Sequence, residues 1–185
     1  MTHSEGVETL KGDLGTKIIK DLCLYSPTIR TRYSDIFVRF WFLKEFIVRF
    51  DKGLIYPDGR FVKTIRRLDA LIIVQPSLSS QVQNWTFKIG FEVKVNLDDL
   101  LRDNKIPYYL GWTDFFFLAV DDALLTTAME KAAKDPRIGV VSLRNGIIHK
   151  YPAWQDIPTG RRYAVMEQAF FGYAGSKDIV NCFKM

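Results

Sequence analysis

Two apolar runs in the middle of the sequence contain charged residues at positions where a buried strand normally has none. Asp69 interrupts the first run, residues 68–74, and the second run, residues 85–95, contains Glu92 and Lys94. Glu92 and Lys94 are two residues apart, so on a strand their side chains leave the same face. If the strand that carries Asp69 lies beside them, two carboxylates and an ammonium group meet at one point of a sheet. The pattern therefore predicts a cation site with a charged partner next to it.

The rest of the sequence predicts one α/β domain around these runs. Hydrophobic periodicity and turn residues predict strands at about 43–51, 61–74, 85–95, 114–120, 138–143 and 147–151. They predict helices at about 13–25, 31–40, 124–134 and 163–173, and a further helix that is capped by Asn96 and ends at Pro107. We expect residues 1–12 to be a loose leader and residues 13–185 to be a single domain, with its core at about 41–150. This order predicts a central mixed β-sheet flanked by helices.

Length and charge are compatible with one soluble domain and a polyanionic partner. The chain has 185 residues, of which 26 are basic and 21 acidic, giving a net charge of +5. No stretch approaches the roughly 18 uninterrupted apolar residues of a membrane-spanning helix. Cys23 and Cys182 lack the spacing of a zinc site, and reduced thiols in a cytoplasmic protein are expected. Phosphate-loop and serine-hydrolase motifs are absent from the sequence.

The residues from Asp69 to the apolar run at 114–120 resemble a known family. Asp69 and Glu92-Val93-Lys94 look like the motif of the PD-(D/E)XK nuclease superfamily. The residues that follow are similar to the MmcB-like DNA repair branch in their order: Asp98, Asp99, Asp103, Lys105, Pro107, Tyr109 and Asp114. The resemblance covers roughly residues 41–150. It implies a restriction-endonuclease-like fold, a Mg²⁺ or Mn²⁺ cofactor and hydrolysis of phosphodiester bonds in DNA.

The motif residues have the chemistry that such hydrolysis needs. Asp69 and Glu92 are hard oxygen ligands suited to Mg²⁺, and the backbone carbonyl of Val93 can add a third ligand. Lys94 would stabilise the phosphate or orient the attacking water. Two simpler interpretations stay open: Asp69 as a capping or turn residue, and Glu92 with Lys94 as a plain ion pair on one strand face.

Two more residues, Glu45 and Lys105, are assigned to the site through the resemblance, and the ring chemistry of Tyr109 makes it a third candidate. Glu45 corresponds to an acidic residue that enters the site from the first strand, and the alternative is a solvated glutamate. Lys105 would lie near the site, and the alternative is a lysine at a helix end. Tyr109 could pack on a base or ribose, or it could be a core tyrosine. Asp99 fits a helix-start charge better than a site residue.

A basic cluster precedes Asp69 and comprises Arg60, Lys63, Arg66 and Arg67. These side chains could guide a phosphate backbone to the site, or they could form a solvated strand face. His3 and His149 have no metal-ligand spacing and are expected to be incidental.

The sequence leads to a hypothesis with two alternatives. The hypothesis is a magnesium-dependent DNA endonuclease or repair nuclease that acts on DNA in the cytoplasm, with a homodimer left open. The first alternative is a DNA-binding module of a repair or mobile-element complex with weak or no cleavage. The second is a structural protein in which the charges form a buried network.

Overall fold

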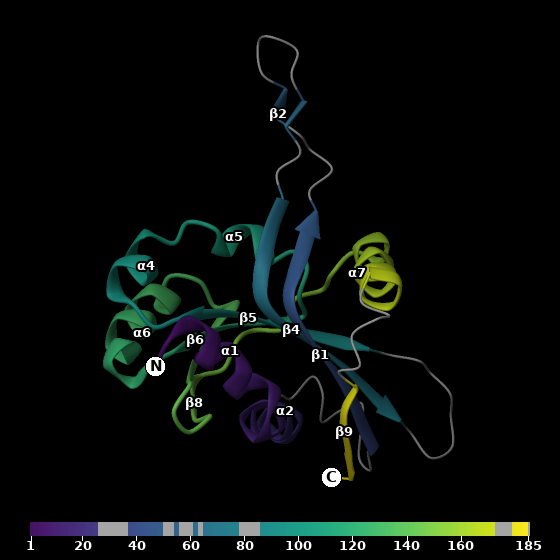
Figure 1. The fold of residues 1–185 in the computed structure, drawn as a ribbon, viewed down its shortest axis with the longest axis horizontal. Coiled ribbons are helices and arrows are strands. Elements are labelled where there is room, and N and C mark those ends of the chain that lie inside the picture. Colours follow the sequence, from purple (N-terminus) through teal and green to yellow (C-terminus); the bar gives the residue numbers. More distant parts are fainter. Residues whose placement is uncertain are drawn as a thin grey trace.

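A seven-stranded mixed sheet forms the centre of the fold, in the order β8-β7-β6-β5-β4-β1-β9 (Figure 1). The computed structural model describes the backbone of residues 1–25, 37–49, 54–55, 61–62, 65–77, 86–172 and 179–184. The sheet strands are β1 (Phe37–Arg49), β4 (Ile65–Ser77), β5 (Phe87–Lys94), β6 (Phe115–Val120), β7 (Ile138–Ser142), β8 (Ile148–Lys150) and β9 (Ile179–Lys184). Strands β5, β6 and β7 are parallel, and the other neighbours are antiparallel. The expected α/β class with a mixed sheet is therefore confirmed.

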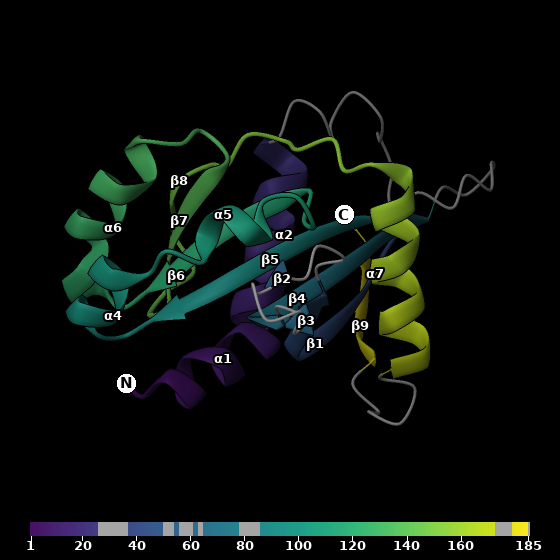
Figure 2. The same ribbon diagram turned by 90° about the horizontal axis from the view of Figure 1, so that it is seen from above.

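Helices cover both faces of this sheet (Figure 2). The first face carries α1 (His3–Lys11) and α2 (Asp13–Tyr25), whose apolar side chains form one core with the sheet. The second face carries α4 (Leu97–Arg102), α5 (Ile106–Tyr109), the 3-10 turn η1 (Asp122–Leu124), α6 (Leu125–Ala133) and α7 (Thr159–Gly172). In the parts of the chain that the structure describes, no helix is both long enough and apolar enough to cross a bilayer.

The central strands are apolar throughout because both of their faces are buried. On β6, Phe115 and Phe117 lie in the core under α1 and α2, whereas Phe116 and Leu118 lie in the core on the opposite face. Every residue of β5 and β6 is buried. The sequence of β6 therefore reads as a continuous hydrophobic run instead of an alternating one.

The charges of β5 all leave one face of the strand. Phe87, Ile89, Phe91 and Val93 belong to the core on the α1 and α2 side. Because strand side chains alternate, Lys88, Glu92 and Lys94 point to the second face, and Gly90 lies between them. The packing of the aromatic residues thus places the candidate site on the face that carries α4 and α5.

An irregularity in β1 lies across from Asp69. Glu45 has a left-handed backbone conformation with φ of 53°. Before it, Phe42 packs in the first core, and after it, Phe46 packs in the second core beside Leu68. The strand therefore changes the face to which its side chains point at the position opposite Asp69.

Two short strands, β2 (Leu54–Ile55) and β3 (Phe61–Val62), pair with each other and not with the main sheet. They lie between β1 and β4 in the sequence and project from the body of the fold in Figure 1. The predicted strand at about 61–74 is therefore wrong at its start, because residues 61–62 form β3 and β4 begins at Ile65.

Several predicted elements agree with the structure. Helix α2 has the predicted bounds, Asn96 caps α4, and β6 matches the strand predicted at about 114–120. The Asn-Gly turn joins β7 and β8 with Gly146 at a φ of 69°. These elements are specified by local sequence, which explains why they could be predicted.

Other predicted elements differ. Residues 1–12 were expected to be a loose leader but contain α1, which is docked on the sheet by buried Val7 and Leu10. Residues 37–40, expected at the end of a helix, are the beginning of β1, and residues 31–36 lie outside the described ranges. Pro107 lies at the start of α5 and does not end the preceding helix. Strand β9, which pairs with β1, was not expected.

Candidate functional site

The site lies where the pairing of β4 and β5 ends. Ala70 and Phe91 form the last residue pair of these antiparallel strands, and Asp69 and Glu92 lie immediately beyond that pair. The Asp69 carboxylate continues the ladder, because its Oδ2 accepts a hydrogen bond of 2.7 Å from the Val93 backbone N–H. The N–H and C=O of one strand residue point to the same side, so the Val93 carbonyl also faces β4. The structure thus brings the predicted carboxylates and this carbonyl to one end of two adjacent strands.

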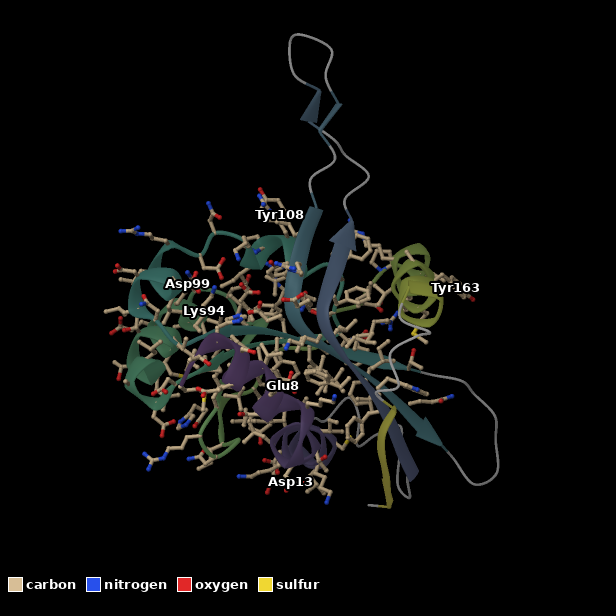
Figure 3. All side chains as sticks on the ribbon, in the orientation of Figure 1. Glu8, Asp13, Lys94, Asp99, Tyr108 and Tyr163 are labelled. Atoms are coloured by element: carbon tan, nitrogen blue, oxygen red, sulfur yellow. The ribbon has the colours of Figure 1, made fainter. Side chains whose placement is uncertain are left out.

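Lys94 is held by three carboxylates. Its Nζ lies 3.1 Å from Glu92 Oε1, 2.9 Å from Asp99 Oδ2 and 2.8 Å from Asp103 Oδ2. The side chains of Glu92 and Lys94 are each 2% exposed, whereas Asp99 is 53% exposed. Figure 3 shows Lys94 and Asp99 side by side next to α4. The Lys94 ammonium group is therefore fixed in the interior of the site. Of its three carboxylate partners, Asp99 is the one that is exposed to solvent.

The first turn of α4 presents Asp99 to this lysine. The Asn96 side chain accepts hydrogen bonds of 2.8 Å from the N–H of Asp98 and 3.4 Å from the N–H of Asp99. This cap, together with the positive end of the helix dipole, favours acidic residues here. Asp99 is both a helix-start charge, as expected, and a partner of Lys94.

Asp103, which is buried, and Lys105, which is partly exposed, complete the site. The Lys131 ammonium group donates to the carbonyl oxygens of Leu100 and Asp103 at 2.6 and 2.7 Å, which ties down the end of α4. Asp103 Oδ1 accepts a 2.8 Å hydrogen bond from the Lys105 N–H. Lys105 Nζ lies 3.3 Å from Glu92 Oε1, and its side chain is 38% exposed. Lys105 thus lies where the resemblance places it.

The site has an excess of negative charge. Asp69, Glu92, Asp99 and Asp103 supply four carboxylates, and Lys94 and Lys105 supply two ammonium groups. Lys131, whose ammonium group interacts with Asp103 and Asp99, supplies a third positive charge, so the net charge is −1 when all seven groups are ionised. A bound cation would offset the repulsion among these carboxylates.

The pKa values of the buried residues Glu92 and Lys94 are both raised in this site. Burial, followed by the charge of Asp69, raises the pKa of Glu92 from 4.5 to about 7, although Lys94 and Lys105 oppose the shift. Burial alone would lower the pKa of Lys94, but the carboxylates of Glu92, Asp103 and Asp99 outweigh it and raise that pKa. Glu92 therefore exchanges a proton near neutral pH, whereas Lys94 stays charged.

The donor set fits a divalent cation. Glu92 Oε2 is buried, and among the described residues it has no hydrogen-bond partner. A buried acceptor without a donor is unfavourable unless a proton or a cation satisfies it. The described residues contain no ready-made cluster of three or more His, Cys, Asp or Glu side chains at metal-binding separations. A cation here would use Asp69 and Glu92 together with the Val93 carbonyl.

One residue at the site was not expected from the sequence. His3, in the first turn of α1, places Nε2 3.1 Å from Asp69 Oδ2. His3 is separated from Asp69 by more than 60 positions and has no ligand spacing, so it was interpreted as incidental. No local pattern could have revealed this contact, because it depends on how α1 docks on the sheet.

The outer residues are arranged around the end of β4. Glu45 lies across from Asp69 in the pairing of β1 with β4, and its Oε2 contacts Arg67 Nη1 at 3.2 Å. The Arg66 guanidinium lies 5.4 Å from the centre of the Tyr108 ring, which is 45% exposed. Lys63 and Arg60 of the predicted basic cluster lie outside the residues whose placement the structure describes.

Tyr109 is a core tyrosine, which was the second of the two interpretations considered for it. It is fully buried, stacks on Phe116 with ring centres 6.0 Å apart, and donates a 2.9 Å hydrogen bond to the Arg67 carbonyl oxygen. A buried ring cannot pack on a base, so the expectation of a nucleic-acid contact at Tyr109 is corrected. The neighbouring Tyr108 is an exposed aromatic side chain at this surface, with the Arg66 guanidinium beside its ring.

Comparisons with known proteins identify no family for the chain. No protein-family model matches it, and a search of curated proteins finds no match. Among solved structures, it is similar to a protein of unknown function from Silicibacter pomeroyi, with 19% sequence identity and a TM-score of 0.47. The similarity covers 74% of this chain and 75% of that protein.

Proposed function

We propose that the chain is a metal-dependent nuclease of the PD-(D/E)XK type, an endonuclease or repair nuclease that hydrolyses phosphodiester bonds in DNA. The observation that carries the proposal is the buried Glu92 carboxylate, which has an oxygen without a donor among the described residues and lies beside Asp69 at the end of two paired strands. The mixed sheet with helices on both faces supports a restriction-endonuclease-like assignment.

Asp69, Glu92 and the Val93 carbonyl would hold Mg²⁺ or Mn²⁺. When bound, the cation supplies a more acidic water and charge neutralisation at the phosphate. The residues around it provide position and charge. Lys94 is held against Glu92 by Asp99 and Asp103, so its ammonium is already fixed where it can stabilise phosphate charge or orient a water.

Basic and aromatic residues near Glu92 and at the end of β4 would bind the DNA backbone. Lys105 is the more exposed of the two lysines on Glu92, which suits a first contact with an approaching phosphate. Arg66 beside the exposed Tyr108 offers a cation next to a stacking surface, and Arg67 is exposed at the same end of β4.

A DNA-binding module without cleavage is the second candidate. The observation in its favour is that Lys94 is 2% exposed and already neutralised by three carboxylates. In that case DNA binding would fall with added salt but would not change in an Asp69→Asn variant or with a chelator.

A cleavage assay separates the two candidates. Purified protein is incubated with supercoiled, linear duplex, single-stranded and branched DNA in the presence of Mg²⁺ or Mn²⁺, and with a chelator. We expect cation-dependent nicking that falls by at least about 100-fold in Lys94→Ala. Lys134→Ala is the matched control, because it removes an exposed lysine at the C-terminal end of α6, and it should keep full activity. Wild-type protein that cleaves none of these substrates would contradict the proposal.

A further inference from the structure

The N-terminal helix brings a histidine to the candidate ligand Asp69, and a capping box sets where this helix begins. Thr2 caps α1 and forms a reciprocal pair with Glu5: the Glu5 N–H donates to Thr2 Oγ1 at 3.3 Å, and the Thr2 N–H donates to Glu5 Oε2 at 2.6 Å. Such a capping box fixes where a helix begins. His3 is therefore held at the first position of α1.

Helix α1 is docked directly over the strand that carries Glu92. Gly6 lies so close to β5 that a Cβ atom there would be 2.8 Å from Val93 Cγ1. Val7 and Leu10 are buried in the first core, and Glu8 forms a 2.9 Å ion pair with Lys44 of β1. The helix is thus anchored to both strands that flank β4, and its first turn reaches the end of β4.

The contact itself uses one oxygen of the carboxylate. His3 Nε2 lies 3.1 Å from Asp69 Oδ2, so the imidazole ring and the carboxylate are in close polar contact. The same oxygen accepts the Val93 N–H at 2.7 Å. Among the described residues, the contacts of Asp69 all go through Oδ2, which leaves Oδ1 for a cation. A backbone hydrogen bond from β5 and a side-chain contact from α1 together restrict the rotation of this carboxylate more than either does alone.

We propose that His3 is a positioning residue of the cation site: it orients the Asp69 carboxylate from outside and thereby strengthens cation binding. The inference rests on the cation-binding part of the function proposed above. The proposal makes α1 part of the cation site, although residues 1–12 were expected to be a loose leader. Hydrogen bonds to metal-ligating carboxylates commonly change metal affinity by about 10- to 100-fold. His3 is 49% exposed, so we expect an effect at the lower end of this range.

Calorimetric titration with Mn²⁺ in the absence of DNA tests the inference. We expect the dissociation constant of Mn²⁺ to rise about tenfold in His3→Ala. His3→Gln should bind almost as the wild type does, because its amide can donate to Asp69 Oδ2. Ser4→Ala changes the adjacent exposed residue of α1 and is the matched control. Thermal unfolding of the metal-free proteins shows whether the variants are folded.

The outcomes separate this inference from the nuclease proposal. Equal Mn²⁺ affinity of wild type and His3→Ala would overturn the role of His3, as would a failure of His3→Gln to restore binding. Weaker Mn²⁺ binding by His3→Ala in a protein that cleaves no DNA would support the role of His3 and contradict the nuclease. If the protein is a nuclease, His3→Ala should reach the wild-type kcat at saturating Mn²⁺, because only the affinity for the cation has changed. A wild type that binds no Mn²⁺ would overturn both proposals.

Discussion

Replacing Glu92 by glutamine should stabilise the metal-free protein, and the gain should grow with pH. The folded-state pKa of Glu92 is raised by burial and by Asp69 from 4.5 to about 7. Between these two values the folded protein binds more protons at this site than the unfolded chain does, so wild-type stability falls as pH rises. Glutamine resembles the protonated carboxyl group and does not ionise. The stability of the variant therefore does not fall with rising pH at this site.

The magnitude follows from the two pKa values. A rise from 4.5 to about 7 corresponds to about 3 kcal/mol of unfolding free energy. The gain of Glu92→Gln over wild type should be close to zero below pH 4.5, where both states of the wild type are protonated. It should reach its full value above the folded pKa, at about pH 8.

Urea unfolding, followed by fluorescence of the four tryptophans, measures this difference. The variant and the wild type are compared at about pH 5 and about pH 8 in the presence of a chelator. Glu130→Gln, at an exposed position of α6, is the matched control and should show no pH-dependent gain. A gain that is equal at both pH values, or a Glu92→Gln variant that is less stable than wild type at the higher pH, would refute the reasoning. The second result would favour a structural charge network.

Three further substitutions test other parts of the account. Lys94→Met leaves Glu92 and Asp103 without their nearest counter-charge and should lower the unfolding free energy by about 3 kcal/mol in the same urea assay, whereas a loss below about 1 kcal/mol would contradict the buried network. Lys88 is fully buried, and burial lowers its pKa from 10.5 to about 8. Lys88→Met should therefore stabilise the protein by about 3 kcal/mol at neutral pH, and this gain should disappear above the ordinary lysine pKa because both states are then uncharged; a pH-independent effect would refute the assignment. Asn96→Ala removes the cap of α4 and should cost about 1 kcal/mol in thermal unfolding, and an unchanged midpoint would show that the cap is not needed.

The central part of the site could be predicted because it depends on strand geometry. Alternation places Glu92 and Lys94 on one face, and the apolar run before them identifies the strand. The position of Asp69 beside them required only that two consecutive strands pair. Lys105 came from the resemblance and not from any periodicity. Its contact with Glu92 depends on how α4 and the following turn fold back over β5.

The N-terminal part of the fold could not be predicted from composition. Helix α1 has two buried apolar side chains, Val7 and Leu10, and its other residues are mostly polar or exposed. Its stability depends on tertiary packing, including the close approach of Gly6 to Val93, which sequence alone does not reveal. The contact of His3 with Asp69 was missed for the same reason.

The edges of the sheet were also difficult to predict. Ile36, Phe37 and Phe40 have the spacing of a helix face, but residues 37–40 pair with both β4 and β9. Strand β9 lies more than 100 residues from β1 in the sequence, so no local signal indicates their pairing. Tyr109 was ambiguous because a tyrosine suits a core as well as a binding surface, and burial decided between them.

Anomalous diffraction from crystals soaked in Mn²⁺ tests most directly whether the acidic end of β4 and β5 is a cation site. We predict a single strong peak within about 2.5 Å of oxygen atoms from both Asp69 and Glu92, and the loss of this peak in Glu92→Gln crystals. Crystals of the wild type that show no Mn²⁺ at these two carboxylates, although the site is open to solvent in the lattice, would contradict the account.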